Sequence, residues 1–447
     1  MSSTPETPRA GTAGKPPSGR TSVRPAAERT PSRLIPWLQN QAVNVTRHAE
    51  ALRPFRREEF GNGAAAPTEA HLQAVNELMG ALRTDLLRLT AQVTAAADHA
   101  ASAPTTEHIQ RVLRCKERAH NWVQAIERIW DFYFELFGQR QSRFGDWLLS
   151  CDRIALDCYQ EAYMGLAVAR PVPAPPPFSY MRTGFSPATY RRGIPLRRLG
   201  QQINPFPLIQ LPYHRLVNPW TLGAVLHEVS HNLHNDLGLE RAVPQAIARR
   251  LLEAGFGRQV AVVWMRWNRE LFADVSGLLL GGPGVVGSLM DVIGRGPQMV
   301  AHYAPGAPHP TPWLRLLISA ELLRRMGFHE EASRYQRTWL RMYPNPRNGS
   351  IPPELLDTWR EVIPLVVDTV CYQPFPSLGD RALAEVLRFA PKHQQMIEEA
   401  ARRLAHGNDP GVVPARFLIG AARIAFEQRL APNETIAQHF YRELARR

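Results

Sequence analysis

The segment Asn218-Pro-Trp-Thr-Leu-Gly-Ala-Val-Leu-His-Glu-Val-Ser-His231 carries the strongest structural signal in this chain. Asn218 can cap a helix, and Pro219 suits the first position of one. In such a helix His227 and His231 are four residues apart and share one face. This spacing allows two imidazoles to bind the same tetrahedral zinc ion. Glu228 lies beside the first histidine, where it can accept a proton from an attacking water.

A second segment supplies the third ligand that a zinc site needs. Trp267-Asn-Arg-Glu-Leu-Phe-Ala-Asp-Val-Ser-Gly277 lies in an apolar stretch with helical periodicity, and its Glu270 and Asp274 are again four residues apart. Carboxylates on an apolar helix are costly to bury unless they are paired or bind a metal. We therefore expect Glu270 to complete a site for one zinc ion per chain. Asp274 is expected to orient a ligand histidine through its other ring nitrogen.

Three other residues are weaker candidates. His234 is disfavoured as a ligand, because seven residues separate it from His227, about 10 Å along an unbroken helix. The segment His309-Pro-Thr-Pro-Trp-Leu-Arg315 opens a further helix. His309 and Arg315 are hydrogen-bond donors suited to the oxyanion that forms when an amide is attacked, so both are candidate catalytic residues.

Taken together, the three motifs resemble those of the gluzincin metallopeptidases, and they are most similar to the CaaX prenyl protease and its bacterial membrane heat-shock relatives. The resemblance covers roughly residues 205–325. It implies that His227, His231 and Glu270 bind zinc and that Glu228 is the general base and acid. It also implies that Asp274 orients a ligand, and that His309 and Arg315 stabilise the tetrahedral intermediate and brace the site. In that family an extended substrate pairs with an edge strand, for which residues 207–212 are the candidate.

The composition is ordinary for a globular protein, and it excludes a collagen, a wholly disordered chain and a disulfide-stapled miniprotein. The 447 residues include 53 Lys+Arg and 40 Asp+Glu, which gives a net charge of +13. Arginine clusters at 191–192 and 197–198 lack interleaved aromatic residues, so nucleic acid is an unlikely partner. The four cysteines form no Cys-x-x-Cys pair and are expected to be buried thiols. No signal peptide or membrane span is evident, so we expect a cytoplasmic protein.

The predicted fold class is mainly α, with a zincin-like catalytic core and a small edge sheet, flanked by an N-terminal helical bundle and C-terminal helices. Periodicity predicts one continuous helix over residues 258–281. The expected divisions are a disordered Pro/Ser/Arg-rich tail (1–35), the N-terminal bundle (36–170), a Pro/Arg-rich linker or strap (171–204), the metallopeptidase core (205–330) and a C-terminal helical region (331–447).

The sequence favours a soluble zinc endopeptidase acting on a protein or peptide substrate. The N-terminal bundle precedes the core in the chain. From that position it could cover the cleft or bind a regulatory partner. Two alternatives remain open at this point. One is a non-catalytic helical scaffold whose metal site is structural or vestigial, and the other is a nucleic-acid-associated protein that uses its basic surface.

Overall fold

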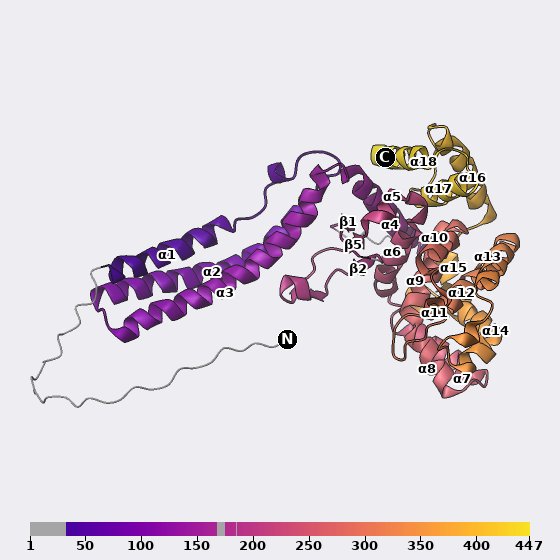
Figure 1. The fold of residues 1–447 in the computed structure, drawn as a ribbon, viewed down its shortest axis with the longest axis horizontal. Coiled ribbons are helices and arrows are strands. Elements are labelled where there is room, and N and C mark those ends of the chain that lie inside the picture. The colour runs from indigo at the N-terminus through magenta and orange to yellow at the C-terminus, as the bar shows by residue number, and fades with distance from the viewer. Residues whose placement is uncertain (1–32, 168–174, 185) are drawn as a thin grey trace, which may run out of the picture.

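A computed structural model describes residues 33–167, 175–184 and 186–447. The predicted tail lies outside the described residues, apart from its last three positions. The described chain is mainly helical with short strands, in agreement with the predicted class. Figure 1 shows that the first three helices form an elongated arm, whereas the later helices gather into a compact body.

Residues 52–68, which include the turn η1 (Arg57–Glu59), and residues 103–105 separate the long helices of the arm. The helices are α1 (Leu34–Ala51), α2 (Glu69–Ser102) and α3 (Thr106–Gly138). The side chains of Thr68 and Thr105 cap α2 and α3 by accepting a hydrogen bond from a backbone N–H three residues later. Apolar residues at helical spacing bury one stripe of each helix in two clusters. One cluster also includes Phe178 and Leu208 of the sheet, which anchors the base of the arm to the body.

Helix α4 (Gly145–Gly165) differs from the predicted organisation, which placed it in the N-terminal bundle. It packs against α6 and α18 in the body instead. Its fully buried residues, such as Ile154 and Tyr159, belong to the main core and not to the clusters of the arm. Arg416 of the C-terminal region also forms ion pairs with Asp157 and Glu161 of α4. The body therefore begins with α4, before the predicted boundary at residue 170.

The small sheet corrects two expectations. It contains β1 (Phe178–Met181), β5 (Leu208–Leu211) and β2 (Ala188–Tyr190) in the order β1-β5-β2. The segment 207–212 was predicted to be an edge strand, but β5 pairs with β1 in parallel and with β2 in antiparallel fashion, so it is central. Its two prolines lie just outside the strand and remove no hydrogen bond from the ladder. The described residues of the predicted linker, 175–184 and 186–204, also supply β1 and β2 and so belong to the folded body.

The remaining elements build the body. Those around the motifs are β3 (Pro195–Leu196), β4 (Gln202–Ile203), α5 (Tyr213–Val217), η4 (Pro219–Thr221), α6 (Gly223–Asp236), α7 (Ala242–Glu253), α8 (Arg258–Arg266), α9 (Asn268–Gly281), α10 (Gly284–Ile293), α11 (Pro297–Val300) and α12 (Pro312–Arg325). The C-terminal ones are α13 (His329–Met342), α14 (Pro353–Val367), the π-helical turn η6 (Asp368–Tyr372), β6 (Pro374–Phe375), β7 (Arg381–Ala382), α15 (Leu383–Val386), α16 (Pro391–Ala405), α17 (Phe417–Glu427) and α18 (Asn433–Arg446).

The helix predicted over residues 258–281 is in fact two helices. The chain turns at Trp267, between α8 and α9, and both Trp264 and Trp267 are buried there. Helix α9 then ends at Gly282, which has a φ of 73° and whose Cβ, if present, would lie 2.2 Å from the ring of Phe389. Pro283 follows and leads into α10. This helix was not predicted, because the stretch is apolar throughout and shows no clear helical period.

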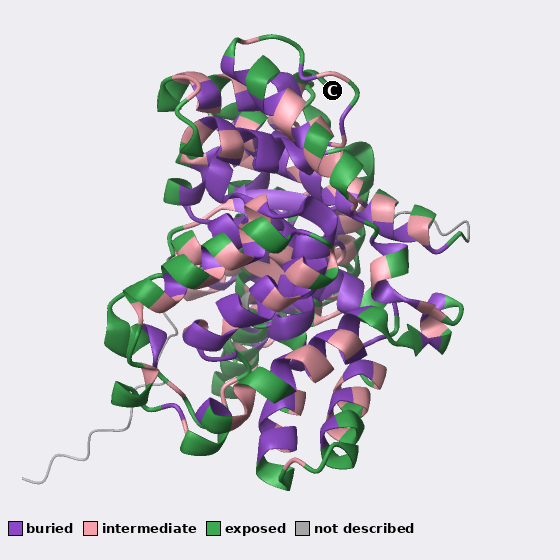
Figure 2. Cartoon of the chain, turned by 90° about the vertical axis from the view of Figure 1, so that its right-hand side faces the viewer, coloured by how far each residue is buried: buried purple, intermediate pink, exposed green. Residues whose placement is uncertain are grey.

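The C-terminal helices share one core with the region that carries the motifs. A single cluster of buried side chains runs from α4 to α18, and Figure 2 shows the buried positions concentrated through the centre of the body. Trp220 stacks on Phe426 of α17 with ring centroids 4.4 Å apart. The predicted boundary near residue 330 therefore does not separate two cores. All four cysteines are free and buried, as expected. None of the described helices combines the length and the apolar character needed to cross a membrane.

Candidate metal centre

Helix α6 holds the first motif in a buried position. The turn η4 precedes it, with Pro219 as its first residue. The predicted cap is wrong: the side chain of Asn218 donates a hydrogen bond back to the carbonyl of His214 and caps neither η4 nor α6. Burial on several sides fixes α6, since Val225, Leu226 and Val229 are fully buried. The helix therefore presents its two histidines at a set orientation.

Helix α9 carries the second motif and lies antiparallel to α6. His227 faces Asp274 near the middle of α9, and His231 faces Glu270 near its start. At the other end of the pair, a Cβ at Gly281 would lie 2.5 Å from the side chain of Leu226. The absence of a side chain at Gly281 therefore allows the two helices to pack closely enough for the carboxylates of one to reach the imidazoles of the other.

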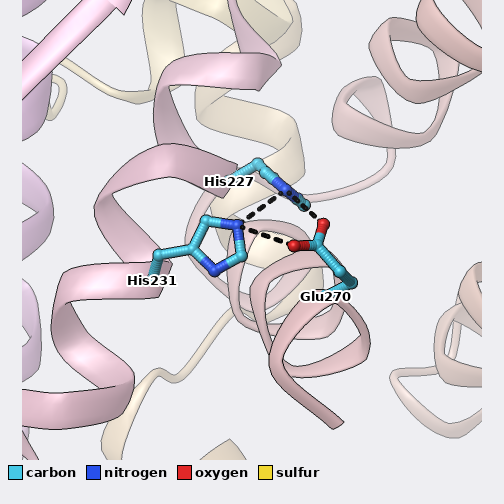
Figure 3. Close-up of side chains that lie close together, drawn as sticks. All are labelled: His227, His231 and Glu270. Carbon is cyan, nitrogen blue, oxygen red and sulfur yellow. Dashed lines mark hydrogen bonds and ion pairs between the residues drawn. The ribbon is translucent and has the colours of Figure 1, made fainter. Parts of the chain in front are cut away.

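Three potential ligand atoms converge between these helices (Figure 3). The Nε2 atoms of His227 and His231 are 3.2 Å apart. The carboxylate of Glu270 places one oxygen 3.4 Å from Nε2 of His227 and the other 3.5 Å from Nε2 of His231. Among the described residues, these three form the group of potential ligands whose atoms lie within 4.8 Å of one another.

The spacing and chemistry of this group fit zinc. A tetrahedral ion with bonds of about 2.0–2.1 Å separates its ligand atoms by about 3.3 Å. The two imidazole nitrogens are 3.2 Å apart, within 0.2 Å of that value, and each oxygen of the Glu270 carboxylate lies 3.4–3.5 Å from one of them. Two imidazoles and one carboxylate are also a donor set that zinc commonly accepts. The residues present therefore suit such an ion.

Asp274 and Arg315 brace the first histidine from behind. Nδ1 of His227 donates to Oδ1 of Asp274 at 2.9 Å, which leaves Nε2 to face the other ligand atoms. Arg315, on α12, donates to both oxygens of Asp274 at 2.7 Å. All three side chains are largely buried. The contact of Asp274 with His227 is the one expected from the sequence, and the guanidinium of Arg315 is engaged by the same carboxylate.

The Asp274→Ala variant is expected to destabilise the metal-free protein by about 3–5 kcal/mol, because Arg315 would become a buried charge without its partner. Zinc affinity is expected to fall by about 10–100-fold, since His227 loses the acceptor that orients it. Urea unfolding and zinc titration against a competing chelator measure the two effects. In the control double variant Asp274→Ala/Arg315→Met, stability should recover in part while affinity stays low. Wild-type stability of the single variant would contradict the role of this pair.

The electrostatic balance favours a cation between the ligands. Burial lowers the pKa of His227, but the hydrogen bonds to Asp274 and Glu270 outweigh it and raise that pKa to about 10. Burial and the charge on His227 lower the pKa of His231 to about 3. In the metal-free protein His227 therefore carries a proton, between the carboxylates of Asp274 and Glu270. Because a metal requires neutral imidazole, its binding would displace that proton.

Glu228 has the properties of a general base. It is buried on α6, lines the cleft described below and is outside the group of three ligands. Burial raises its pKa to about 7 from an ordinary value of 4.5, although the charge on His227 opposes this rise. A carboxylate with a pKa near neutrality is well matched to accepting and returning a proton.

The other candidate histidines have different surroundings. The side chain of His309 is 60% exposed, and its Nε2 lies 3.3 Å from an oxygen of Glu270, so this loop residue does reach the site. His234 is buried and stacks on Phe272 with ring centroids 4.4 Å apart. Its Nε2 has no hydrogen-bond partner among the described residues, and it lies outside the ligand group, as expected from its spacing.

A cleft of about 360 Å³ opens onto the three ligands. Residues 186–189, which lead into and begin edge strand β2, line this cleft, and so does His309. Sequence reasoning missed this strand and also Arg269, which lines the cleft beside Glu270. No periodic pattern marks a strand of three residues. The position of Arg269 directly before a potential ligand was the signal available for it.

Comparison with known proteins adds no relative to this description. No family model matches the chain, and neither does any curated protein or solved structure. The chain's own geometry is therefore the ground for a functional proposal. That geometry combines a potential three-ligand metal site, a carboxylate base beside it and a cleft that gives access to both.

Proposed function

We propose that this protein is a zinc-dependent endopeptidase. The observation that carries the proposal is the convergence of His227, His231 and Glu270, whose potential ligand atoms lie within 4.8 Å of one another, on a cleft that Glu228 also lines. Three protein ligands are typical of catalytic zinc sites, whereas structural sites usually have four. The gluzincin resemblance of the three motifs supports the same reaction.

Zinc, when bound, would polarise the scissile carbonyl and lower the pKa of the attacking water. Glu228 takes the proton of that water and returns it to the leaving amine, a task for which its pKa near 7 is suited. His227 is held in one tautomer by Asp274, and Arg315 holds Asp274. These contacts keep the reacting groups in place while the proton moves.

His309 and strand β2 suit the substrate's backbone. The imidazole of His309 is exposed at the cleft, 3.3 Å from Glu270, where it can donate to the oxyanion that develops on the carbonyl. Strand β2 pairs only with β5 within the described sheet, so its other edge is available. An extended peptide that adds to this edge would lie over the ligands. In this proposal β2 replaces residues 207–212 as the substrate-pairing strand.

Metal removal tests the proposal directly. The zinc-loaded protein is expected to cleave internal peptide bonds in an unfolded protein such as reduced casein, as observed by mass spectrometry of the products. A chelator should abolish cleavage, and added zinc should restore it, because the reaction depends on the three-ligand site. Cleavage that survives complete zinc removal would contradict the proposal. Zinc binding without cleavage of any peptide would instead favour the scaffold with a structural metal site.

A further inference from the structure

The cleft has two chemically different ends. Helices α6 and α9 are antiparallel, so the start of α6 lies beside the end of α9 and close to α10. The end of α6 lies beside the start of α9, where Arg269 is placed. The potential metal ligands lie between these two ends. A substrate that crosses the ligands therefore meets a different environment on each side of the bond to be cleaved.

The end beside α10 is apolar. No charged side chain from α10 lines it, and the apolar residues that line the cleft here are Ala224, Leu278, Val285, Val286, Leu289 and Val292. Leu278 and Val286 are buried, and Val285, Leu289 and Val292 are only partly exposed. An aliphatic side chain of a substrate would remove this surface from water, at roughly 25 cal/mol for each Å² buried.

The opposite end is basic. Arg269 is exposed and lines the cleft, and it makes no hydrogen bond or ion pair with any described residue. Arg191, at the end of β2, donates a hydrogen bond to Asn235 and so lies at the same end of α6. Of the acidic residues that line the cleft, Glu270 and Asp274 are engaged by histidines and by Arg315, and Glu228 makes no hydrogen bond or ion pair with Arg269. The guanidinium of Arg269 is thus available to a ligand.

Strand β2 gives the cleft a direction. Thr189 contacts Asn232, and two residues later Arg191 contacts Asn235, so β2 runs in the same direction as α6. Antiparallel pairing is slightly more stable per residue than parallel pairing. A peptide antiparallel to β2 would run from the Arg269 end to the apolar end. Its N-terminal side would lie near Arg269 and its C-terminal side near α10.

We propose that the substrate is a peptide with an acidic residue on the N-terminal side of the cleaved bond and an aliphatic residue on its C-terminal side. Arg269 recognises the carboxylate by a charge-assisted hydrogen bond, and the apolar end of the cleft accepts the aliphatic side chain. This inference rests on the proposed peptidase function and adds its substrate class. Arg269, directly before Glu270, becomes a specificity-determining residue.

Charge reversal tests the role of Arg269. The zinc-loaded wild type is incubated with a synthetic peptide library of randomised sequence, and the cleavage sites are read by mass spectrometry. Acidic residues should be enriched by about tenfold on the N-terminal side, a value typical of one hydrogen bond to a charged group. In Arg269→Glu the enrichment should shift to lysine and arginine. The control Arg266→Glu removes an exposed arginine outside the cleft and should keep the wild-type pattern.

A binding measurement separates this inference from the proposed function. Zinc-loaded Glu228→Gln is titrated with a labelled peptide of acidic-then-aliphatic order, with the same peptide carrying glutamine for the acid, and with the reversed order. Tighter binding of the first, lost when Arg269→Glu is added, supports the inference even if the wild type cleaves nothing. Equal binding of all three would overturn it. Library cleavage without a charge preference would also overturn it and leave the peptidase proposal intact.

Discussion

Replacing Glu270 with alanine is expected to lower the zinc content of the purified protein from about one ion per chain to nearly none. The carboxylate supplies one of three ligand positions and contacts both histidines, at 3.4 Å and 3.5 Å. Its loss leaves two imidazoles, which hold zinc only weakly. It also removes the anion that lies nearest to both Nε2 atoms, so the remaining site favours a cation less. Elemental mass spectrometry of the wild type and the variant measures the difference.

Controls distinguish loss of a ligand from loss of fold. Glu240→Ala removes an exposed carboxylate outside the cleft and should leave the zinc content unchanged. Circular dichroism should give the same helical signal for both variants, because Glu270 lines a cleft and fills no part of the core. A Glu270→Ala protein that keeps one tightly bound zinc would mean that these three residues are not the ligands. The peptidase proposal would then lose its support.

The helices and the cluster of potential metal ligands could be predicted from sequence because both depend on spacing within a helix. His227 and His231 share a face at any position of a regular helix, as do Glu270 and Asp274. The apolar residues around each pair predict burial, and burial of two carboxylates requires partners. The contact between α6 and α9 could then be predicted, because the carboxylates of α9 can bind the same metal ion as the histidines of α6 or accept hydrogen bonds from them.

Features that depend on contacts between distant parts of the chain could not be predicted from sequence patterns. Residues 207–212 look like an edge strand because prolines bound them, yet both edges of β5 are paired by segments up to 30 residues distant. The periodicity of α4 predicts a helix but not that its apolar face joins the core of the body. Arg269 becomes significant only once the direction of the cleft is known. Each of these features depends on residues that are distant in the sequence. Local periodicity does not predict which distant residues will be in contact.

Glu228→Gln is expected to lower kcat/KM by about 10²–10⁴-fold or more, while the zinc content stays near one ion per chain. Glutamine preserves the shape and hydrogen-bonding capacity of the side chain, but it cannot take a proton from water. Because Glu228 is outside the ligand group, the metal site should remain intact. Peptide hydrolysis and elemental analysis on the same preparation measure both quantities. A zinc-loaded variant with wild-type turnover would contradict the role of Glu228 as the base.

The same substitution is expected to stabilise the metal-free protein, and its pH dependence identifies the cause. Burial raises the pKa of Glu228 from 4.5 to about 7, so the folded protein binds more protons than the unfolded chain between these values. Stability of the wild type is thus lost as pH rises through this window, by about 3 kcal/mol in total at about 1.4 kcal/mol per pKa unit. Glutamine does not titrate, so the advantage of the variant in urea unfolding should be small at pH values near 4.5 and greatest above about 7. An advantage that does not change with pH would mean that the Glu228 carboxylate is not held at a raised pKa. A buried carboxylate with a raised pKa lowers the free energy of unfolding at neutral pH. Such a destabilising residue at Glu228 is consistent with a functional role as a base.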